Sequence, residues 1–354
     1  MKTVKTVLYV LILSVLGVIL VLVISYRSDL SPALLVEKYS GPSSYFLKVN
    51  DMNVHVQVKG EGEAIFLLHG SFSSSHTWEA WEQELNPYFM TISIDLPGHG
   101  LTGPDPQKRY QIADFADLVF EVASQLGIRE FHVAGNSMGG EVALAMATRF
   151  PERILSLNLI DAAGAPQVKE MTKASGRPWI FYLAESRLFG GILLKCTPRI
   201  LFSMNLRQVY SDQKSITAEQ VDRYYELMRR RGNRQATIDR MAQRKGAVYD
   251  FSQLKMPVLI MWGEEDNWIS PANAERFSEA IPSAIVKLYP KVGHVPMEES
   301  PTETVGDYLG FLGIQADVDY FSAPKYYSYG NSNAYPCFSS NLDRAMPMDH
   351  QKAF

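Results

Sequence analysis

The sequence predicts an α/β protein, with a mostly parallel, doubly wound sheet of about eight strands and a helical cap inserted between two of those strands. Three observations predict this fold class. Short apolar or alternating runs, bounded by Gly, Asp, Asn or Pro, recur along the chain and are typical of strands. Amphipathic segments such as residues 110–128 lie between them and indicate helices. Between residues 164 and 256 the alternation stops, which indicates several helices inserted between consecutive strands.

The predicted strands change in character along the chain. The first two, "YFLKV" and "VHVQV", alternate between apolar and polar residues, whereas later runs such as "AIFLLHG" and "PVLIMWG" are nearly all apolar. This change is expected where antiparallel edge strands lead into a parallel sheet that has helices on both faces. Helices between parallel strands form right-handed crossovers. We therefore expect a core at residues 45–164 and 256–313, with a cap at residues 165–255 over the carboxyl ends of the strands.

Composition excludes several classes of protein. The chain has 354 residues, of which 46% are hydrophobic, so it can bury a substantial core. Its net charge of -4 argues against nucleic acid as a partner, because phosphate binding requires a strong basic excess. Cys196 and Cys337 are too few for a disulfide framework and lack the spacing of metal ligands.

The N-terminal segment has the pattern of a membrane-inserting helix. Residues 7–24 form an uncharged apolar run, with Lys2 and Lys5 before it and Arg27 after it. About 18 residues at a rise of about 1.5 Å give about 27 Å of helix, close to the hydrocarbon thickness of a bilayer. We expect residues 1–25 to be a transmembrane anchor, with the body on the non-cytoplasmic side, periplasmic or extracellular, because the lysines stay cytoplasmic. A cleaved signal, which gives a secreted protein, and a buried soluble helix are the alternatives.

Two further segments lack regular periodicity. Residues 26–44 carry Ser, Pro and mixed charges, and we expect a short linker there. Residues 314–354 are rich in Tyr, Ser, Asn and Pro, and we expect a loose C-terminal tail. Packing of the tail's tyrosines on the body is the alternative.

The stretch "VAGNSMGGEVALAMA" places a serine at the point where an apolar strand turns into a helix. Gly135, Gly139 and Gly140 remove side-chain bulk on both sides of Ser137. A G-x-S-x-G motif in a strand, turn and helix context is the pattern of a nucleophile elbow, where a strained serine is exposed at the end of a strand. The sequence therefore predicts Ser137 as a nucleophile. A glycine-rich turn with an idle serine is the alternative.

A serine nucleophile needs a general base and a carboxylate that orients the base. His294 follows a glycine in the loop after the last predicted strand, and we expect it to be the base. A histidine that caps the next helix is the alternative role. Asp266 follows the strand "PVLIMWG", and the chain order Ser, Asp, His is the one expected for this topology. Asp161, after the strand "LSLNLI", is the rival carboxylate.

An acyl-transfer site with a serine nucleophile also needs backbone amides that stabilise a developing oxyanion. The N–H of Met138, directly after the nucleophile at a helix start, supplies one. We expect the second from the loop after "AIFLLHG", at Ser71 or Phe72. His69 in the same loop is expected to brace it rather than to react. His55, in an early alternating strand, is expected at the surface.

Five stretches together resemble the α/β-hydrolase-fold serine hydrolases: "LLHGSFSSSHTW", "DLPGHGLT", "GNSMGG", "GEEDNWI" and "GHVPMEESP". The resemblance covers about residues 45–312. It implies that Asp95 and His99 shape a loop beside the site without reacting. It also implies that no metal and no organic cofactor takes part, and the sequence contains no zinc or phosphate-loop motif.

The resemblance implies an esterase or lipase-like enzyme that cleaves carboxylic esters through an acyl-enzyme. Epoxide hydrolases and haloalkane dehalogenases share the scaffold but carry an aspartate where Ser137 stands. The elbow is similar to that of C–C bond hydrolases of ring-fission products, whose Gly-Pro-rich oxyanion loop is replaced here by "HGSFSSSHTW". C–C hydrolysis is therefore an alternative, as is a non-catalytic binding module, and proline iminopeptidases and cofactor-free haloperoxidases share the triad.

Two features of the predicted cap bear on the partners. Residues 179–194, "WIFYLAESRLFGGILL", fit an apolar acyl pocket or ordinary helix packing. Basic residues outnumber acidic ones between residues 223 and 245, which favours a solvated helix face, with contact to anionic lipid as the alternative. The expected partners are a small-molecule ester with an apolar acyl group and, through residues 1–25, a membrane.

Overall fold

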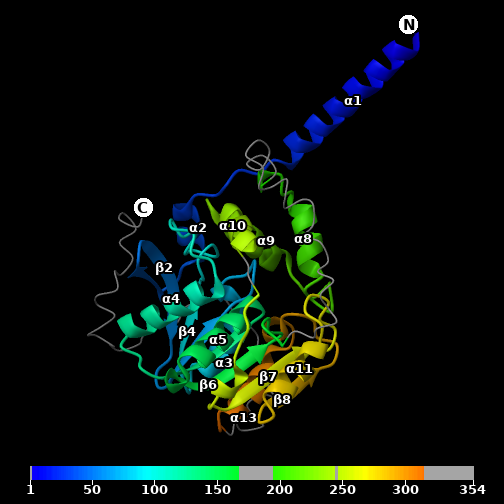
Figure 1. Cartoon of the computed structure of the whole chain (residues 1–354). Coiled ribbons are helices and arrows are strands. Elements are labelled where there is room, and N and C mark those ends of the chain that lie inside the picture. The colour runs from blue at the N-terminus through cyan, green and yellow to red at the C-terminus, as the bar shows by residue number, and fades with distance from the viewer. Residues whose placement is uncertain (1, 167–193, 244–245, 315–354) are drawn as a thin grey trace.

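An eight-stranded sheet runs through the computed structural model, which describes residues 2–166, 194–243 and 246–314 (Figure 1). The strand order is β1-β2-β4-β3-β5-β6-β7-β8. The strands are β1 (Ser44–Val49), β2 (Met52–Lys59), β3 (Ala64–Leu68), β4 (Met90–Ile94), β5 (Phe131–Asn136), β6 (Ile154–Ile160), β7 (Val258–Gly263) and β8 (Ile285–Tyr289). β2 pairs antiparallel with β1 and β4, and the other neighbours pair parallel. The predicted sheet with its antiparallel edge is confirmed.

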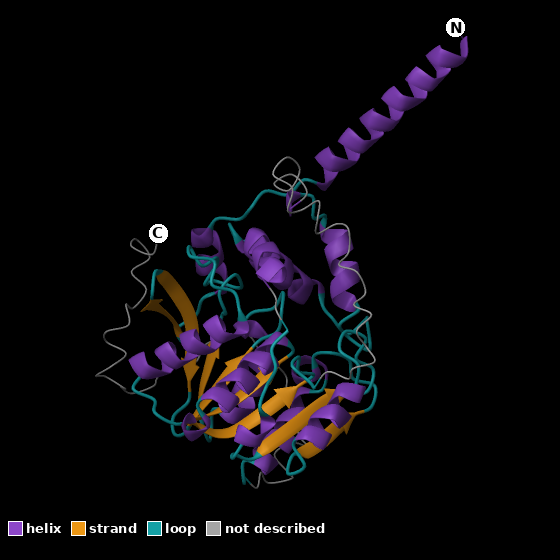
Figure 2. Cartoon of the chain, in the orientation of Figure 1, coloured by secondary structure: helices purple, strands orange, loops and turns teal. Residues whose placement is uncertain are grey.

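Helices cover both faces of this sheet (Figure 2). Successive residues of β3 point to opposite faces, because Phe66 and Leu68 belong to one buried cluster and Ile65 and Leu67 to the other. The first cluster also contains residues of α4 (Ile112–Gln125), α5 (Met138–Arg149) and α11 (Ala272–Ala280), and the second contains residues of α3 (Glu79–Leu85) and α13 (Pro301–Phe311). Strands buried on both faces have continuous apolar sequences, which is why the parallel strands were predictable.

Helix α4 shows how local chemistry sets one of these elements. The backbone N–H of Gln111, just before the helix, donates to the carboxylate of Asp114 at 2.9 Å. Phe115, Val119 and Val122 then lie on one buried side of the helix. Burial of each of these side chains stabilises the fold by about 1.5–3 kcal/mol.

Three described helices form the cap between β6 and β7: α8 (Arg199–Arg207), α9 (Ala218–Met228) and α10 (Asn233–Gln243). Cap residues Leu206 and Tyr224 line the same cavity as Ser137 and His294, which follow β5 and β8. These cap residues therefore lie over the carboxyl ends of the strands (Figure 1). Of the expected acyl-pocket stretch, residues 179–193 lie outside the described residues.

Residues 26–44 differ from the expected linker because they contain a helix. Helix α2 (Pro32–Tyr39) buries Leu35 and Val36 in a small cluster with Leu101 of the core and Leu227 of the cap. Eight residues are too few to display a helical period, although a proline in the first turn is a helix-start signal. Before α2, the N–H of Leu30 donates to the carbonyl of Arg229 at 2.8 Å.

The basic run of the cap is not a uniformly solvated face, which corrects the favoured interpretation. Arg234 is 5% exposed and forms an ion pair with Asp29 at 2.5 Å, and Arg240 is 8% exposed. Arg231 is exposed, and residues 244–245 lie outside the described part of the chain. Charge counts along a sequence do not show which side chains fold inward.

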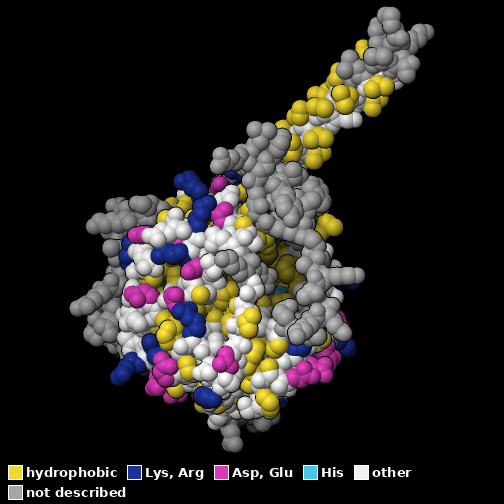
Figure 3. Space-filling view, in the orientation of Figure 1, with side chains coloured by type: hydrophobic (Ala, Val, Ile, Leu, Met, Phe, Trp, Pro, Cys, Tyr) yellow, Lys and Arg dark blue, Asp and Glu magenta, His cyan; other side chains and the backbone are white. Residues whose placement is uncertain are grey.

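Helix α1 (Lys2–Ser25) precedes this body and exposes its apolar side chains, which Figure 3 shows in yellow along its described length. Among the described residues, no helix is long and apolar enough to cross a membrane. The side chains of residues 2–5 and 8 of α1 are outside that description. The expected anchor therefore stays a prediction. The expected loose tail, apart from Ile314, also lies outside the described residues.

Candidate active site

Ser137 stands at a strained turn between β5 and α5. Its backbone has φ 56° and ψ -116°, a conformation that costs energy for a residue with a Cβ. Two backbone hydrogen bonds hold it: the N–H of Ser137 donates to Ile160, and the N–H of Ala163 donates to Ser137, both at 3.0 Å. Ser137 thereby stands at the end of β5, where it lines a cavity.

The glycines around Ser137 are required by close backbone approach. A Cβ on Gly135 would lie 2.2 Å from the carbonyl oxygen of Gly139, and a Cβ on Gly139 would lie 2.1 Å from that of Leu68. Gly140 packs against Ala162, where a Cβ would meet a methyl group at 2.5 Å. Any side chain at these positions pushes the turn and the helix apart.

His294 and Asp266 meet behind this turn. Nδ1 of His294 lies 2.7 Å from Oδ2 of Asp266, and both side chains are buried. The other carboxylate oxygen of Asp266 accepts from the backbone N–H groups of Trp268 and Ile269 at 2.7 and 3.0 Å. Because both oxygens have donors, the carboxylate is held in the orientation that fixes the imidazole.

Asp161 lies beside this pair but has a different partner. Its Oδ1 accepts from the N–H of Gly263 at 3.0 Å, and its side chain is fully buried. Burial, reinforced by the neighbouring charge of Asp266, raises the pKa of Asp161 well above its usual value. Asp266, and not Asp161, contacts His294, which favours the predicted pairing over the rival one.

The three side chains also form a group whose donor atoms lie within 4.8 Å of one another. It is the one such group of His, Cys, Asp and Glu among the residues with described placement. Two ligands of one tetrahedral zinc ion lie roughly 3.3 Å apart, given bond lengths of about 2.0–2.1 Å. The 2.7 Å between Asp266 and His294 fits a direct hydrogen bond instead.

Asn136 ties the turn at Ser137 to the loop that carries His294, a role that sequence reasoning missed. Its side-chain amide donates to the carbonyls of His294 and Ile160 at 2.9 and 3.2 Å, and the residue is buried. The motif "GNSMGG" contained the residue, but only the fold brings its partner, 158 positions away, into contact.

The loop after β3 runs beside Ser137. A Cβ on Gly70 would lie 3.0 Å from the Cβ of Ser137, so the loop approaches Ser137 closely. The hydroxyl of Ser71 contacts the sulfur of Met138 at 3.6 Å, and Phe72 has a positive φ of 65°. The three predicted oxyanion-hole residues therefore lie on two segments that meet at Ser137.

A buried hydrogen-bond network supports this loop. His69 donates from Nδ1 to the carbonyl of Gly70 at 2.7 Å and accepts at Nε2 from Leu96, which is the predicted bracing role. Asp95 accepts from His55 at 2.8 Å. His55 is 1% exposed, so the expectation of a surface histidine is wrong. Its strand lies between β1 and β4, and its Nε2 lies 3.0 Å from the hydroxyl of Ser44 on β1.

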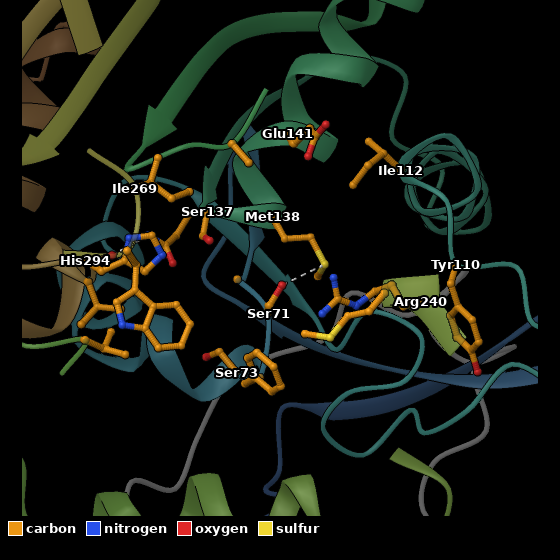
Figure 4. Close-up of a pocket in the computed structure, with 18 of the residues that line it drawn as sticks. Ser71, Ser73, Tyr110, Ile112, Ser137, Met138, Glu141, Arg240, Ile269 and His294 are labelled. Carbon is orange, nitrogen blue, oxygen red and sulfur yellow. Dashed lines mark hydrogen bonds between the residues drawn. The ribbon is translucent and has the colours of Figure 1, made fainter. Parts of the chain in front are cut away.

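Five of the six predicted site residues line one cavity of about 900 Å³: Ser71, Phe72, Ser137, Met138 and His294. Asp266 stands behind His294. Figure 4 shows Ser137 and His294 side by side at one end of the cavity, with the contact from Ser71 to Met138 next to them. The remaining walls are largely apolar.

Two glutamates join the histidine loop to the cap, and sequence reasoning missed both. Glu298 on α12 (Pro296–Glu299) accepts from the hydroxyls of Tyr210 and Tyr224 at 2.6 and 2.5 Å. Glu299 accepts from the backbone N–H groups of Gly293 and Ser211 at 2.8 and 2.7 Å. The cap therefore helps to hold the loop that carries the imidazole.

Known proteins with similar sequences include lipases. The family model described as alpha/beta hydrolase fold matches residues 63–301. The chain is 27% identical over 261 residues to Lipase 1 of Psychrobacter immobilis, which covers 72% of this chain and 78% of the lipase.

Solved structures with the same architecture include two hydrolases. One is a membrane phospholipase A described as a bacterial virulence factor, with 26% identity, a TM-score of 0.64, and coverage of 88% of this chain and 98% of the other. A meta-cleavage product hydrolase has 21% identity, a TM-score of 0.63, and coverage of 76% and 97%. With the family model matching more than half of its length, the chain belongs to the alpha/beta-hydrolase-fold family of hydrolases.

Proposed function

We propose that this protein hydrolyses carboxylic esters through an acyl-enzyme, with Ser137 as nucleophile, His294 as base and Asp266 as the orienting carboxylate. One observation carries the proposal: the strained Ser137 opens into the same cavity as His294, whose Nδ1 is held by Asp266. The similarity to a lipase supports an ester as the substrate.

In the proposed reaction, Nε2 of His294 takes the hydroxyl proton as Oγ of Ser137 attacks the ester carbonyl carbon. Asp266 keeps the imidazole in the correct tautomer and stabilises the imidazolium that forms. The oxyanion accepts hydrogen bonds from the backbone N–H of Met138 and from the Ser71–Phe72 loop. The imidazolium then protonates the leaving alcohol, and water repeats the sequence to release the acid.

The cavity walls support an apolar acyl group. Ile112, Phe202, Leu206 and Ile269 contribute side chains to it. Each methylene of an acyl chain buried against such a wall stabilises the complex by about 0.8 kcal/mol. We therefore expect kcat/KM to rise with acyl length until the chain no longer fits.

Two measurements test the proposed chemistry: covalent labelling by a fluorophosphonate, and turnover of p-nitrophenyl esters of increasing acyl length. Ser137→Ala is expected to abolish both. Ser73→Ala is the matched control, because it removes another hydroxyl that lines the same cavity. Undiminished turnover in Ser137→Ala contradicts the proposal. Turnover of a ring-fission diketone alone favours C–C hydrolysis, and ligand binding without any turnover favours a binding module.

We also propose that α1 holds the protein at a membrane, with its body on the non-cytoplasmic side. The exposed apolar side chains of α1, from Tyr9 to Ile24, support this, as do Lys2 and Lys5 before them. The similar structure of a membrane phospholipase A points the same way.

Fractionation of expressing cells tests this location. The full chain is expected in the membrane pellet after washing with high salt and alkali, whereas a chain that begins at Tyr26 is expected in the soluble fraction. External protease is expected to cut the body in intact cells or spheroplasts. A shortened protein in the medium indicates a cleaved signal, and a full-length soluble protein contradicts the anchor.

A further inference from the structure

The cavity that contains Ser137 carries a permanent positive charge in its wall. Arg240 is the only lysine or arginine among the described residues that line it. A guanidinium stays protonated at any pH that a protein experiences. Inside a largely apolar wall its field is weakly screened, so it attracts an anionic group of a ligand more strongly than a surface arginine does.

The side chain of Arg240 turns inward from cap helix α10, since the residue is 8% exposed. Figure 4 shows its guanidinium beside Met138 and Ser71, next to the oxyanion loop. Burial lowers the pKa of His69 and His99 beneath that loop, and the charge of Arg240 contributes to both shifts. The charge of Arg240 therefore acts close to the oxyanion loop, while its residue forms part of the cavity wall.

The acidic residue in the described wall occupies a different place. Glu141 lies on α5 beyond Met138, near Ile112 (Figure 4). The hydroxyl of Tyr249 donates to its Oε1 at 3.1 Å. An anionic group of a substrate is repelled there and attracted near Arg240, so the wall distinguishes two orientations of a substrate that has one charged end.

We propose that Arg240 binds an anionic group of the substrate, a carboxylate or a phosphate, and that the enzyme prefers esters with such a group over neutral esters of equal length. This inference rests on the proposed ester hydrolysis. The planar fork of guanidinium N–H groups matches both anions, and such charge-assisted bonds are stronger than neutral ones. The bulk of the cavity still takes the apolar part.

Paired substrates test the preference and distinguish the two anions. Mono-4-nitrophenyl adipate is compared with 4-nitrophenyl hexanoate, and hexanoyl lysophosphatidic acid with monohexanoylglycerol. Arg240→Gln is expected to lower the ratio of kcat/KM for the anionic and neutral esters by about 10- to 100-fold for the preferred anion. Arg240→Lys is expected to restore part of it. The exposed Arg231 provides the control, since Arg231→Gln removes equal charge outside the cavity wall.

Binding is measured separately, so that the subsite is tested even without turnover. In a Ser137→Ala background, calorimetry compares monomethyl adipate with methyl hexanoate, and the lysophosphatidic acid with the glyceride, each with and without Arg240→Gln. Turnover with an unchanged ratio, and binding that ignores Arg240, overturn the subsite and leave ester hydrolysis standing. Anion binding that depends on Arg240, without ester turnover, supports the subsite and refutes the proposed reaction.

Discussion

At the residue scale, the turn at Ser137 depends on Gly135, Gly139 and Gly140, which allow close approach of the backbone. A methyl group on Gly135 would clash with the carbonyl oxygen of Gly139. Moving the backbone at either glycine to relieve this clash would displace Ser137, which lies between them. Gly135→Ala is therefore expected to destabilise the fold by about 1–3 kcal/mol and to reduce turnover sharply. Thermal unfolding and the extent of fluorophosphonate labelling measure the two effects.

The control for Gly135→Ala is the same substitution at Gly306 in α13, Gly306→Ala. No heavy atom lies within 4 Å of the Cβ that it adds, and the position is inside a helix. Alanine there is expected to stabilise the protein by up to about 1 kcal/mol without altering labelling. If Gly135→Ala and Gly306→Ala had the same stability and the same labelling, the turn at Ser137 would not be tightly packed.

The two buried aspartates are distinguished by the same reasoning. Asp266→Asn removes the acceptor that holds Nδ1 of His294 in its tautomer, and turnover is expected to fall by on the order of ten-thousandfold. Asp161→Asn keeps a side-chain oxygen for the N–H of Gly263 and leaves the contact between Asp266 and His294 in place, so it is expected to lower turnover by less than about tenfold. Steady-state kinetics with one p-nitrophenyl ester compares the turnover of the two variants. A larger loss of turnover in Asp161→Asn than in Asp266→Asn would make Asp161 the orienting carboxylate.

At the element scale, the residues that sequence reasoning identified are those whose signal is local. Ser137, Asp266 and His294 each follow an apolar strand and sit in a short stretch with glycine or turn residues, so a few neighbours suffice to mark them. Asn136 belongs to the recognised motif, but its hydrogen-bond partner is the carbonyl of His294. Contact between residues so far apart in sequence depends on the assembled sheet. The inward turn of Arg240 depends likewise on how the cap packs.

The contact between α12 and the cap is expected to make the stability of the fold depend on pH. Burial raises the pKa of Glu299 from 4.5 to about 7, although the N–H groups of Ser211 and Gly293 oppose the shift. The folded protein thus retains a proton that the unfolded chain loses above pH 4.5. The stabilising contribution is complete below that pH and is lost as pH rises through about 7.

Glu299→Gln is expected to flatten the fall in unfolding free energy between pH 5 and 8, because the amide does not titrate. Denaturant titrations across this range measure the slope. Glu275→Gln on the exposed side of α11 is the control, and it is expected to leave the slope unchanged. An identical slope in the wild type and in Glu299→Gln would place the titrating group elsewhere.

At the scale of the whole molecule, the segment between α1 and the sheet connects three parts of the protein. Helix α2 buries Leu35 between the core and the cap, and Asp29 forms an ion pair with Arg234 of the cap. Sequence reasoning interpreted this stretch as a linker because most of its residues are polar. The few apolar residues that dock α2 on the core and the cap do not form a recognisable pattern. The membrane helix proposed above would thus continue directly into the part of the chain that holds the cap on the core.

This connection predicts which parts of the N-terminus matter for stability. Removal of residues 1–25 is expected to leave the melting temperature and the hydrolysis of soluble esters unchanged, because none of the described residues of this segment lines the cavity. Asp29→Ala is expected to destabilise the fold by about 1–3 kcal/mol, since it removes the carboxylate from a buried guanidinium. Asp222→Ala breaks a solvent-exposed pair with Arg199 and should cost less than about 1 kcal/mol. Thermal unfolding and ester kinetics of the three variants measure these effects. A large fall in melting temperature on removal of residues 1–25 would mean that α1 is part of the folded body rather than an attachment to it.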